Sequence, residues 1–311
     1  QTGGILAGNA GKNIIAGNSG DDTLSGGAGD DEYIFAAGWG VDTIVEIAGG
    51  GADTLDFIAL TTGLTFTLNG LKVTDGLGNQ LNHAGDFIET LLGGSGADTF
   101  ALPDGFISNA VIDGRAGSDT LSYTGNTTAR SVTLTGLGLV DGFTGAASGL
   151  VNDFTNIDAL LGGNAQDTLT ALDAESTWTI TGANSALYTR GNSLAVTAFD
   201  ILVGSFENDT LTFATSGHAT LTDLGPVDGF NVTEAGFTGE FHNINTIIGG
   251  PGADSLTGFD SVALWAVTTT NAGAYTSTRE LTFSNVETLV GGTDDDTLTF
   301  AAFSTSRNIT I

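Results

Sequence analysis

The stretch that decides the fold consists of three adjacent segments, GNAGKNIIA at residues 8–16, GNSGDDTLS at 17–25 and GGAGDDEYI at 26–34. They align without gaps at a nine-residue period, which places an apolar residue at the same position of each segment, at Ile15, Leu24 and Tyr33. Counting nine residues back reaches Leu6, so the pattern is already running near the start of the sequence. Short periodic repeats of this kind indicate an architecture in which each unit buries its apolar face against the next.

A second, longer repeat occupies the later part of the chain. VTLTGLGLVDGF (132–143) matches ATLTDLGPVDGF (219–230), and FTNIDALLGG (154–163) matches FHNINTIIGG (241–250), both at an offset of 87 residues. The last five residues, 307–311, read like 130–134, so we expect the sequence to be part of a longer array.

One signature links the two repeats: a Gly-rich turn, then Asp, then Thr or Ser, then an apolar residue. Its Asp residues are Asp22, Asp42, Asp53, Asp98, Asp119, Asp167, Asp209, Asp254 and Asp296. After residue 90 most of them are roughly 42 to 48 residues apart, which is too long for one solenoid coil. Extra strands or hairpins are therefore expected between successive turns.

Thr-rich alternation, as in 65–68 and 131–135, favours strands over helices. Together with the repeats it predicts an all-β chain, a β-solenoid with inserted hairpins in the longer repeats. The predicted divisions are a nonapeptide block with its closing segment at 1–58, a divergent β repeat at 59–131, two 87-residue repeats at 132–218 and 219–305, and the start of a further repeat at 306–311.

The turns have the composition of calcium sites. Calcium takes six to eight oxygen ligands, many of them backbone carbonyls. Glycine adopts the positive φ values that turn carbonyls toward an ion at no steric cost. Residues 26–34 fit the GGxGxDxUx motif at every position, and residues 17–25 depart from it only at Asn18.

GNSGDDTLS and GGAGDDEYI resemble the nonapeptide repeats of the RTX, or hemolysin-type, calcium-binding family, and residues 31–57 are similar to the segment that closes such a block. The resemblance implies a right-handed parallel β-roll in which a turn and the turn one coil later share a calcium ion. Carried over by position, it implies the ligands Asp22 and Asp31, with the uncharged Asn13 making a weaker site, and less directly Asp42 and Asp53.

An alternative reading exists for every one of these acids, because Asp in a Gly-Asp turn often caps the turn with its own side chain. For Asp22 and Asp31 the ligand role is favoured. Both roles stay open for four acids, Asp98, Asp119, Asp254 and Asp296. Capping is favoured for Asp167 and Asp209, where the residues directly before the acid lack glycine.

Charge narrows the classes of partner. The 36 acidic residues face 7 basic ones, a net charge of -29, so the compact state repels itself unless cations neutralise it. Nucleic acid is disfavoured as a partner, because Lys and Arg are few and scattered.

There are no cysteines for disulfides or thiolate metal sites. No apolar run approaches the 18 or so residues that span a bilayer, so membrane insertion is not expected.

No catalytic motif is present, and an enzyme is not expected. The strings nearest to a GxSxG nucleophile elbow place glycine beside serine, and a P-loop ending at Lys12 would need glycine where Leu6 stands. The three histidines, His83, His218 and His242, lack the short spacing of zinc or catalytic sites. Trp178 and Trp265 recur in register and are read as core residues rather than sugar platforms.

Three functions remain open. The first is a calcium-stabilised, self-associating structural segment of a secreted surface protein, such as a filament, sheath, S-layer or giant adhesin. The second is the RTX secretion and folding module of an extracellular enzyme or toxin. The third is a glycan-binding adhesin repeat, which predicts that replacing Trp178 or Trp265 removes glycan binding while the fold survives. All three place the protein outside the cell or at its surface.

Overall fold

The computed structural model describes residues 3–84 and 87–300, and in these residues every regular element is a strand. The all-β solenoid prediction is therefore confirmed. None of the described residues forms a helix that could span a bilayer. The chain divides into two compact units, 1–168 with 191–198 (unit 1) and 169–190 with 199–311 (unit 2). The boundaries predicted at residues 58, 131, 218 and 305 stay predictions, and the repeat start predicted at 306–311 lies outside the described residues.

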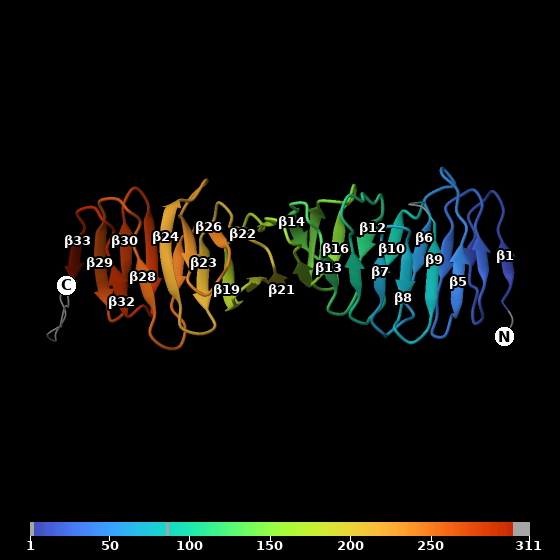
Figure 1. Cartoon of the computed structure of the whole chain (residues 1–311), viewed down its shortest axis with the longest axis horizontal. Helices are drawn as coiled ribbons and strands as arrows, with labels where there is room; N and C mark the ends of the chain where they lie inside the picture. Colours follow the sequence, from blue (N-terminus) through green and yellow to red (C-terminus); the bar gives the residue numbers. More distant parts are fainter. Residues whose placement is uncertain (1–2, 85–86, 301–311) are drawn as a thin grey trace. The chain divides into compact units, whose positions relative to one another are not determined.

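Unit 1 consists of two sheets of short strands (Figure 1). Sheet A has the order β1 (Ile5–Ala7), β3 (Thr23–Ser25), β5 (Val41–Ile44), β9 (Gln80–His83), β8 (Lys72–Thr74), β7 (Thr65–Thr67), β11 (Thr99–Ala101), β13 (Thr120–Ser122), β17 (Ala159–Leu161) and β21 (Asn192–Thr197). Sheet B has the order β2 (Ile14–Ile15), β4 (Glu32–Ile34), β6 (Thr54–Asp56), β10 (Thr90–Leu92), β12 (Val111–Asp113), β16 (Phe154–Ile157), β15 (Phe143–Ala147) and β14 (Ser131–Leu137).

One coil of the solenoid takes two nonapeptides, one strand for each sheet. The parallel register pairs Leu6 with Leu24 in sheet A and Ile15 with Tyr33 in sheet B, an offset of 18 residues in both cases. Leu24 and Tyr33 are fully buried and Ile15 is 6% exposed, as the repeat phase predicts. The first nine-residue segments therefore form alternating strands of a roll whose interior they share.

Antiparallel meanders interrupt this parallel stacking where the repeats are long. β7, β8 and β9 form one in sheet A, with β9 against β5 and β7 against β11. β14, β15 and β16 form another in sheet B. Each meander adds two strands to one sheet, and these are the inserted hairpins that the wide Asp spacing predicts.

Unit 2 is built in the same way from sheets C and D. Sheet C has the order β20 (Ser185–Arg190), β19 (Ser176–Gly182), β23 (Asp209–Phe213), β27 (Thr246–Ile248), β31 (Glu280–Ser284), β30 (Ala272–Thr276), β29 (Leu264–Thr269) and β33 (Thr297–Phe300). Sheet D has the order β22 (Ile201–Val203), β26 (Glu240–Ile244), β25 (Phe230–Glu234), β24 (His218–Leu224), β28 (Ser255–Thr257) and β32 (Thr288–Val290). β18 (Thr168–Thr170) contains the boundary between the units.

The 87-residue offset relates strands as well as letters. β14 at 131–137 corresponds to β24 at 218–224, and the correspondence continues strand by strand from β15 and β25 to β23 and β33. Each core is apolar and strongly aromatic. In unit 1, Phe35 stacks on Phe57 with ring centroids 4.7 Å apart, and Phe66 stacks on Phe100 at 4.5 Å.

Candidate calcium-binding turns

The acids of the Asp-Thr signature form hydrogen-bonded ladders from coil to coil. In each rung, Oδ1 of an acid accepts the backbone N–H of a residue about one coil earlier. In unit 1 the rungs are Asn13 to Asp31 (2.7 Å), Asp22 to Asp42 (2.8 Å), Asp31 to Asp53 (2.9 Å), Leu64 to Asp98 (2.7 Å), Asp98 to Asp119 (2.8 Å) and Arg130 to Asp167 (2.7 Å). Gly217 to Asp254 (2.5 Å) and Ala263 to Asp296 (3.1 Å) are rungs of unit 2. These bonds hold the acids in line just before the strands.

A glycine five residues before the acid makes room for its carboxylate. A methyl group added to Gly26 would lie 2.0 Å from Oδ2 of Asp31, and one added to Gly17 would lie 2.7 Å from Oδ2 of Asp22. The same relationship holds at 93, 114, 162, 204, 249 and 291, before the acids 98, 119, 167, 209, 254 and 296. The sequence motif did not reveal this Gly-x4-Asp spacing. It also holds at Asp167 and Asp209, where the residues directly before the acid lack glycine.

The second carboxylate oxygen separates these acids, apart from Asp53, into two groups. In the first group Oδ2 accepts a backbone N–H from its own turn, from Gly94 to Asp98 (2.8 Å), Gly163 to Asp167 (2.6 Å), Ser205 to Asp209 (2.5 Å) and Gly292 to Asp296 (2.9 Å). Both oxygens of these acids have a hydrogen-bond donor. Asp167 and Asp209 therefore have the geometry of turn caps, which agrees with the role favoured for them, and Asp98 and Asp296 have the same geometry.

In the second group Oδ2 is buried and has no hydrogen-bond donor. This group comprises Asp22, Asp31, Asp42, Asp119 and Asp254. Each of these side chains is at most 5% exposed. A buried carboxylate oxygen without a partner is costly, because the ion has lost its water and gained nothing in exchange. A bound cation would supply the missing partner, so these five residues fit calcium.

Backbone carbonyls of the following coil lie near two of these carboxylates. A methyl group on Gly114 would lie 2.6 Å from Oδ2 of Asp119 and 2.3 Å from the carbonyl oxygen of Asn156. On Gly249 it would lie 2.9 Å from Oδ2 of Asp254 and 1.9 Å from the carbonyl oxygen of Asn285. In residues 3–84 and 87–300 no three His, Cys, Asp or Glu side chains gather as a metal site. Calcium bound here would therefore rely on carbonyls as well as carboxylates, which suits its preference for many oxygen ligands.

Burial makes four of the turn carboxyl groups hard to ionise without a cation. It raises the pKa of Asp42, Asp53 and Asp98 to about 6. The pKa of Asp119 rises to about 7, first through burial and then through repulsion from Asp98 and other nearby acids. A divalent cation would remove both causes, because it solvates the carboxylate and cancels the repulsion.

Glu46 lies beside the turn that contains Gly26 and Asp31, and no sequence motif predicted it. It is 6% exposed, and its Oε1 accepts the hydroxyl of Tyr33 and the backbone N–H of Gly26, the latter at 2.9 Å. Its Oε2 is buried without a donor, like Oδ2 of Asp31. Burial and the Glu46 carboxylate raise the pKa of Tyr33 well above its usual range. Glu46 is thus a further acid beside the Asp31 turn.

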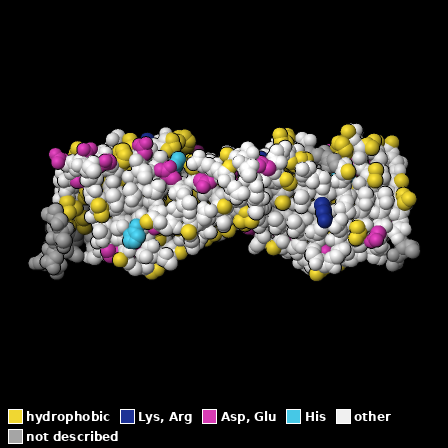
Figure 2. Space-filling view, in the orientation of Figure 1, with side chains coloured by type: hydrophobic (Ala, Val, Ile, Leu, Met, Phe, Trp, Pro, Cys, Tyr) yellow, Lys and Arg dark blue, Asp and Glu magenta, His cyan; other side chains and the backbone are white. Residues whose placement is uncertain are grey.

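Few cations of the chain itself meet these acids. Described Lys and Arg side chains form ion pairs at Lys12 with Glu32 (4.0 Å), Arg115 with Asp113 (3.3 Å) and Arg130 with Asp104 (2.9 Å). On the face drawn in Figure 2, Asp and Glu side chains greatly outnumber Lys and Arg. The acid excess of the composition is therefore not neutralised internally.

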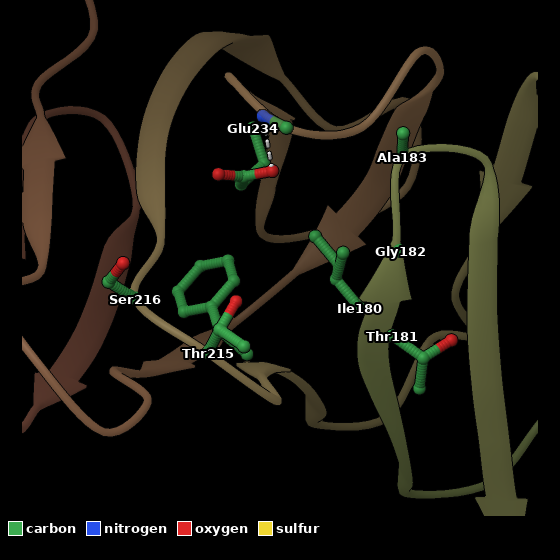
Figure 3. A pocket seen from close by; sticks show the side chains of 9 residues that line it. Ile180, Thr181, Gly182, Ala183, Thr215, Ser216 and Glu234 are labelled. Atoms are coloured by element: carbon green, nitrogen blue, oxygen red, sulfur yellow. Dashed lines mark hydrogen bonds between the residues drawn. The ribbon is translucent and has the colours of Figure 1, made fainter.

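A pocket of about 180 Å³ lies in unit 2 between the β19–β20 turn and the loops after β23 and β25 (Figure 3). The acid that lines it is Glu234, whose Oε1 accepts the N–H of His218 (3.1 Å) and whose Oε2 accepts that of Gly236 (2.6 Å). Both oxygens are thus occupied by backbone donors, and Glu234 has the geometry of a turn cap.

The tryptophans and histidines have structural surroundings. Trp178 is fully buried and Trp265 is 3% exposed, so both lie in the core as predicted. His83 contacts the carbonyl of Ile44 through Nδ1 at 3.1 Å, and His242 contacts Glu240 at 3.1 Å. His218 is exposed, with Nδ1 2.9 Å from Oγ of Ser255.

The comparison with known proteins supports calcium binding at these turns. The RTX calcium-binding nonapeptide repeat matches the chain in four copies, over residues 7–44, 83–101 and 243–261. These segments contain Asn13, Asp22, Asp31 and Asp42, then Asp98, then Asp254. No curated protein matches the chain. Over these segments the chain therefore contains copies of the RTX, or hemolysin-type, calcium-binding nonapeptide repeat.

Proposed function

We propose that this chain is a calcium-stabilised structural segment of a secreted surface protein, of the kind that builds a filament, sheath, S-layer or giant adhesin, and that it is not an enzyme. An extracellular location rests on the RTX repeats, whose proteins are typically secreted. There calcium is abundant, so a chain exported unfolded would fold on arrival. Binding of calcium to the folded state alone adds its binding free energy to the stability of the fold.

The observation that carries this proposal is the group of five buried carboxylate oxygens without donors, at Asp22, Asp31, Asp42, Asp119 and Asp254. They occur in both units and lie at the turns that stack coil on coil. A cation bound at such a turn ties one coil to the next, which is a structural rather than a catalytic task.

The repeat architecture supports a structural role further. Solenoid coils stabilise each other by stacking, and strands about 4.8 Å apart make an element whose length grows with the number of repeats. Strand edges of such sheets can add strands of another copy. Self-association into a polymer or lattice is therefore part of the proposal.

Electron microscopy at millimolar calcium and in chelator tests this proposal, with circular dichroism on the same samples. We expect filaments or a lattice with calcium, and loss of both assembly and β-structure in chelator. β-structure that is complete in chelator and unchanged by calcium would refute the calcium-driven fold.

The alternative function is the secretion and folding module of an extracellular enzyme or toxin, and the RTX repeats favour it as a second candidate. It predicts the same calcium-driven folding. It differs in predicting a protein that stays monomeric at high concentration in calcium, which analytical ultracentrifugation would show.

A further inference from the structure

Two equivalent hairpin loops lie beside the turn acids, one in each unit. Loop 1 is 138–142 between β14 and β15, and loop 2 is 225–229 between β24 and β25. Both are closed by the N–H of their first glycine donating to the carbonyl of their last, at 3.1 Å in each loop. In both, an Asn amide oxygen accepts the N–H of the central Val, at 3.0 Å in loop 1 and 3.2 Å in loop 2. Their backbones can therefore be compared position by position.

Loop 2 holds a positive charge against its carbonyls. The guanidinium of Arg279 donates to the carbonyl oxygens of Gly225 (2.6 Å), Gly229 (3.1 Å) and Val227 (3.2 Å). Burial raises the pKa of Asp228 in the same loop, and the charge of Arg279 opposes this rise. Three carbonyls directed at one cationic group show that this loop conformation favours a cation.

Loop 1 has the same shape but no such cation. The residue 87 positions before Arg279 is Asn192, whose amide donates to the carbonyl of Gly142 at 2.7 Å. The nearby Arg115 is paired with Asp113 instead, at 3.3 Å. Three carbonyls of loop 2 therefore accept hydrogen bonds from a guanidinium, whereas the residue at the equivalent position beside loop 1 supplies only a neutral amide.

The acids around loop 1 are also more numerous. Asp141 accepts the N–H of Gly117 at 3.2 Å, and Asp158 accepts the N–H of Asp119 at 3.1 Å. Asp158 corresponds to the neutral Asn245 in unit 2, which accepts the N–H of Asp209 at 3.0 Å. With every acid ionised, loop 1 and its turn carry three negative charges from 119, 141 and 158. The equivalent group in unit 2 carries two negative charges, from 209 and 228, and the positive charge of Arg279.

Two oxygens beside loop 1 have no donor. Oδ2 of Asp119, a fully buried side chain, and Oδ1 of Asp141 are both buried and unpartnered. The backbone N–H groups of Gly117 and Asp119, two residues apart, donate to Asp141 and Asp158, so the carboxylates of this turn and of loop 1 lie close together. In unit 2, Oδ1 of Asp228 is likewise without a donor, but there the charge of Arg279 compensates it, and Asp209 is capped by Ser205.

We propose that loop 1, together with Asp119 and Asp141, binds a divalent cation, Ca²⁺, in the place that the guanidinium of Arg279 takes in loop 2. The donors are carboxylate and carbonyl oxygens, which suit Ca²⁺ and offer nothing to softer metals. The site joins the turn acid Asp119 to a hairpin loop that is not itself a Gly-Asp turn. One 87-residue repeat would thus require calcium where the other carries its own cation.

Reciprocal substitutions in the full chain test the proposal, with calcium stoichiometry measured by isothermal titration calorimetry. Asn192→Arg supplies the guanidinium to loop 1 and is expected to remove one bound calcium. Asn192→Gln, the matched neutral control, is expected to leave the number unchanged. Arg279→Asn combined with Asn245→Asp gives loop 2 the neutral amide and the additional acid of loop 1, and is expected to add one although Asp209 is capped, because Oδ1 of Asp228 has no donor. Equal stoichiometry in Asn192→Arg and Asn192→Gln would overturn the proposal.

Hydrogen exchange of residues 138–142 is a second measurement of calcium binding at loop 1, and it does not depend on counting the bound ions. In the wild type we expect calcium to slow exchange in loop 1 by tenfold or more. In Asn192→Arg the loop should be protected equally with and without calcium. Hydrogen exchange in loop 1 of the wild type that does not change with calcium would refute the site. Calcium binding at the turns of Asp22, Asp31, Asp42 and Asp254 would be untouched by that result.

Discussion

The backbone N–H of Asp22 donates to Oδ1 of Asp42, 2.8 Å away and 20 residues later in the chain. Both side chains are buried, and each keeps Oδ2 without a donor. One oxygen of each acid therefore serves the fold, and the other is left for a ligand. Substitutions can therefore distinguish acids that bind calcium from acids that only cap a turn.

Asp31→Asn and Asp98→Asn should behave in opposite ways. Oδ1 of Asp31 has a donor and Oδ2 has none, so Asn keeps the hydrogen bond, removes the charge and puts an NH2 group in the place of the oxygen without a donor. We expect Asp31→Asn to be neutral or slightly stabilising in chelator and to raise the calcium midpoint of folding about tenfold, which corresponds to ~1.4 kcal/mol. Calcium titration followed by circular dichroism measures both.

Asp98→Asn is the matched control, because both of its oxygens accept backbone N–H groups. An amide cannot accept at both positions, so one buried N–H loses its partner. We expect a loss of about 1–3 kcal/mol that is the same with and without calcium. Similar calcium midpoints for the two variants would contradict the division of the acids into ligands and caps.

Acid should stabilise the calcium-free fold. The pKa values of Asp42, Asp53 and Asp98 are raised to about 6 and that of Asp119 to about 7, against about 3.9 in an unfolded chain. Between these values the folded state binds more protons than the unfolded state, so stability falls as pH rises from 4 to 7. We expect a higher melting temperature at pH 5 than at pH 7.5 in calcium-free buffer.

Calcium should reverse this dependence, because it binds the ionised carboxylates and competes with protons for them. At millimolar calcium the melting temperature should be higher at pH 7.5 than at pH 5. Differential scanning calorimetry at the two pH values, with and without calcium, measures all four conditions. Parallel pH profiles in the two buffers would count against these acids as calcium ligands.

Gly26→Ala should damage the fold at one turn. The added methyl would lie 2.0 Å from Oδ2 of Asp31, so the carboxylate must move away from its ladder. We expect a loss of about 1–3 kcal/mol in urea unfolding, together with weaker calcium binding. Gly136→Ala is the control, since nothing lies within 4 Å of its added methyl and the residue is in strand β14. Equal losses of stability in the two variants would show that the Gly-x4-Asp spacing has no steric role.

The local period was enough to predict the coil. Nine-residue repeats with one apolar position fix the strands and their phase, and the pairing of Leu6 with Leu24 follows directly. The departure from the motif at Asn18 is also absorbed locally. Its φ of 65° lies in the left-handed region that Gly27 occupies at the equivalent position with 99°, and Asn tolerates that region better than most residues.

The ligand set could not be predicted to the same degree, because it depends on contacts distant in the sequence. Whether Oδ2 of an acid is free depends on whether its own turn folds back to donate an N–H, as at Asp98 but not at Asp31. Glu46 reaches the Gly26 turn only because the closing segment packs there, 20 residues later. Asp141 reaches the turn of Asp119 through a meander whose position no local pattern reveals.

Trp178→Ala distinguishes a core residue from a glycan platform. The indole is fully buried and packs on Tyr188 with ring centroids 4.7 Å apart, so its removal leaves a large cavity. We expect a loss of about 3–5 kcal/mol in urea unfolding at saturating calcium. Phe206→Ala, at an aromatic side chain that is 71% exposed, should change stability by less than about 0.5 kcal/mol. A Trp178→Ala variant that keeps its full stability but loses binding on a glycan array would instead support the adhesin reading.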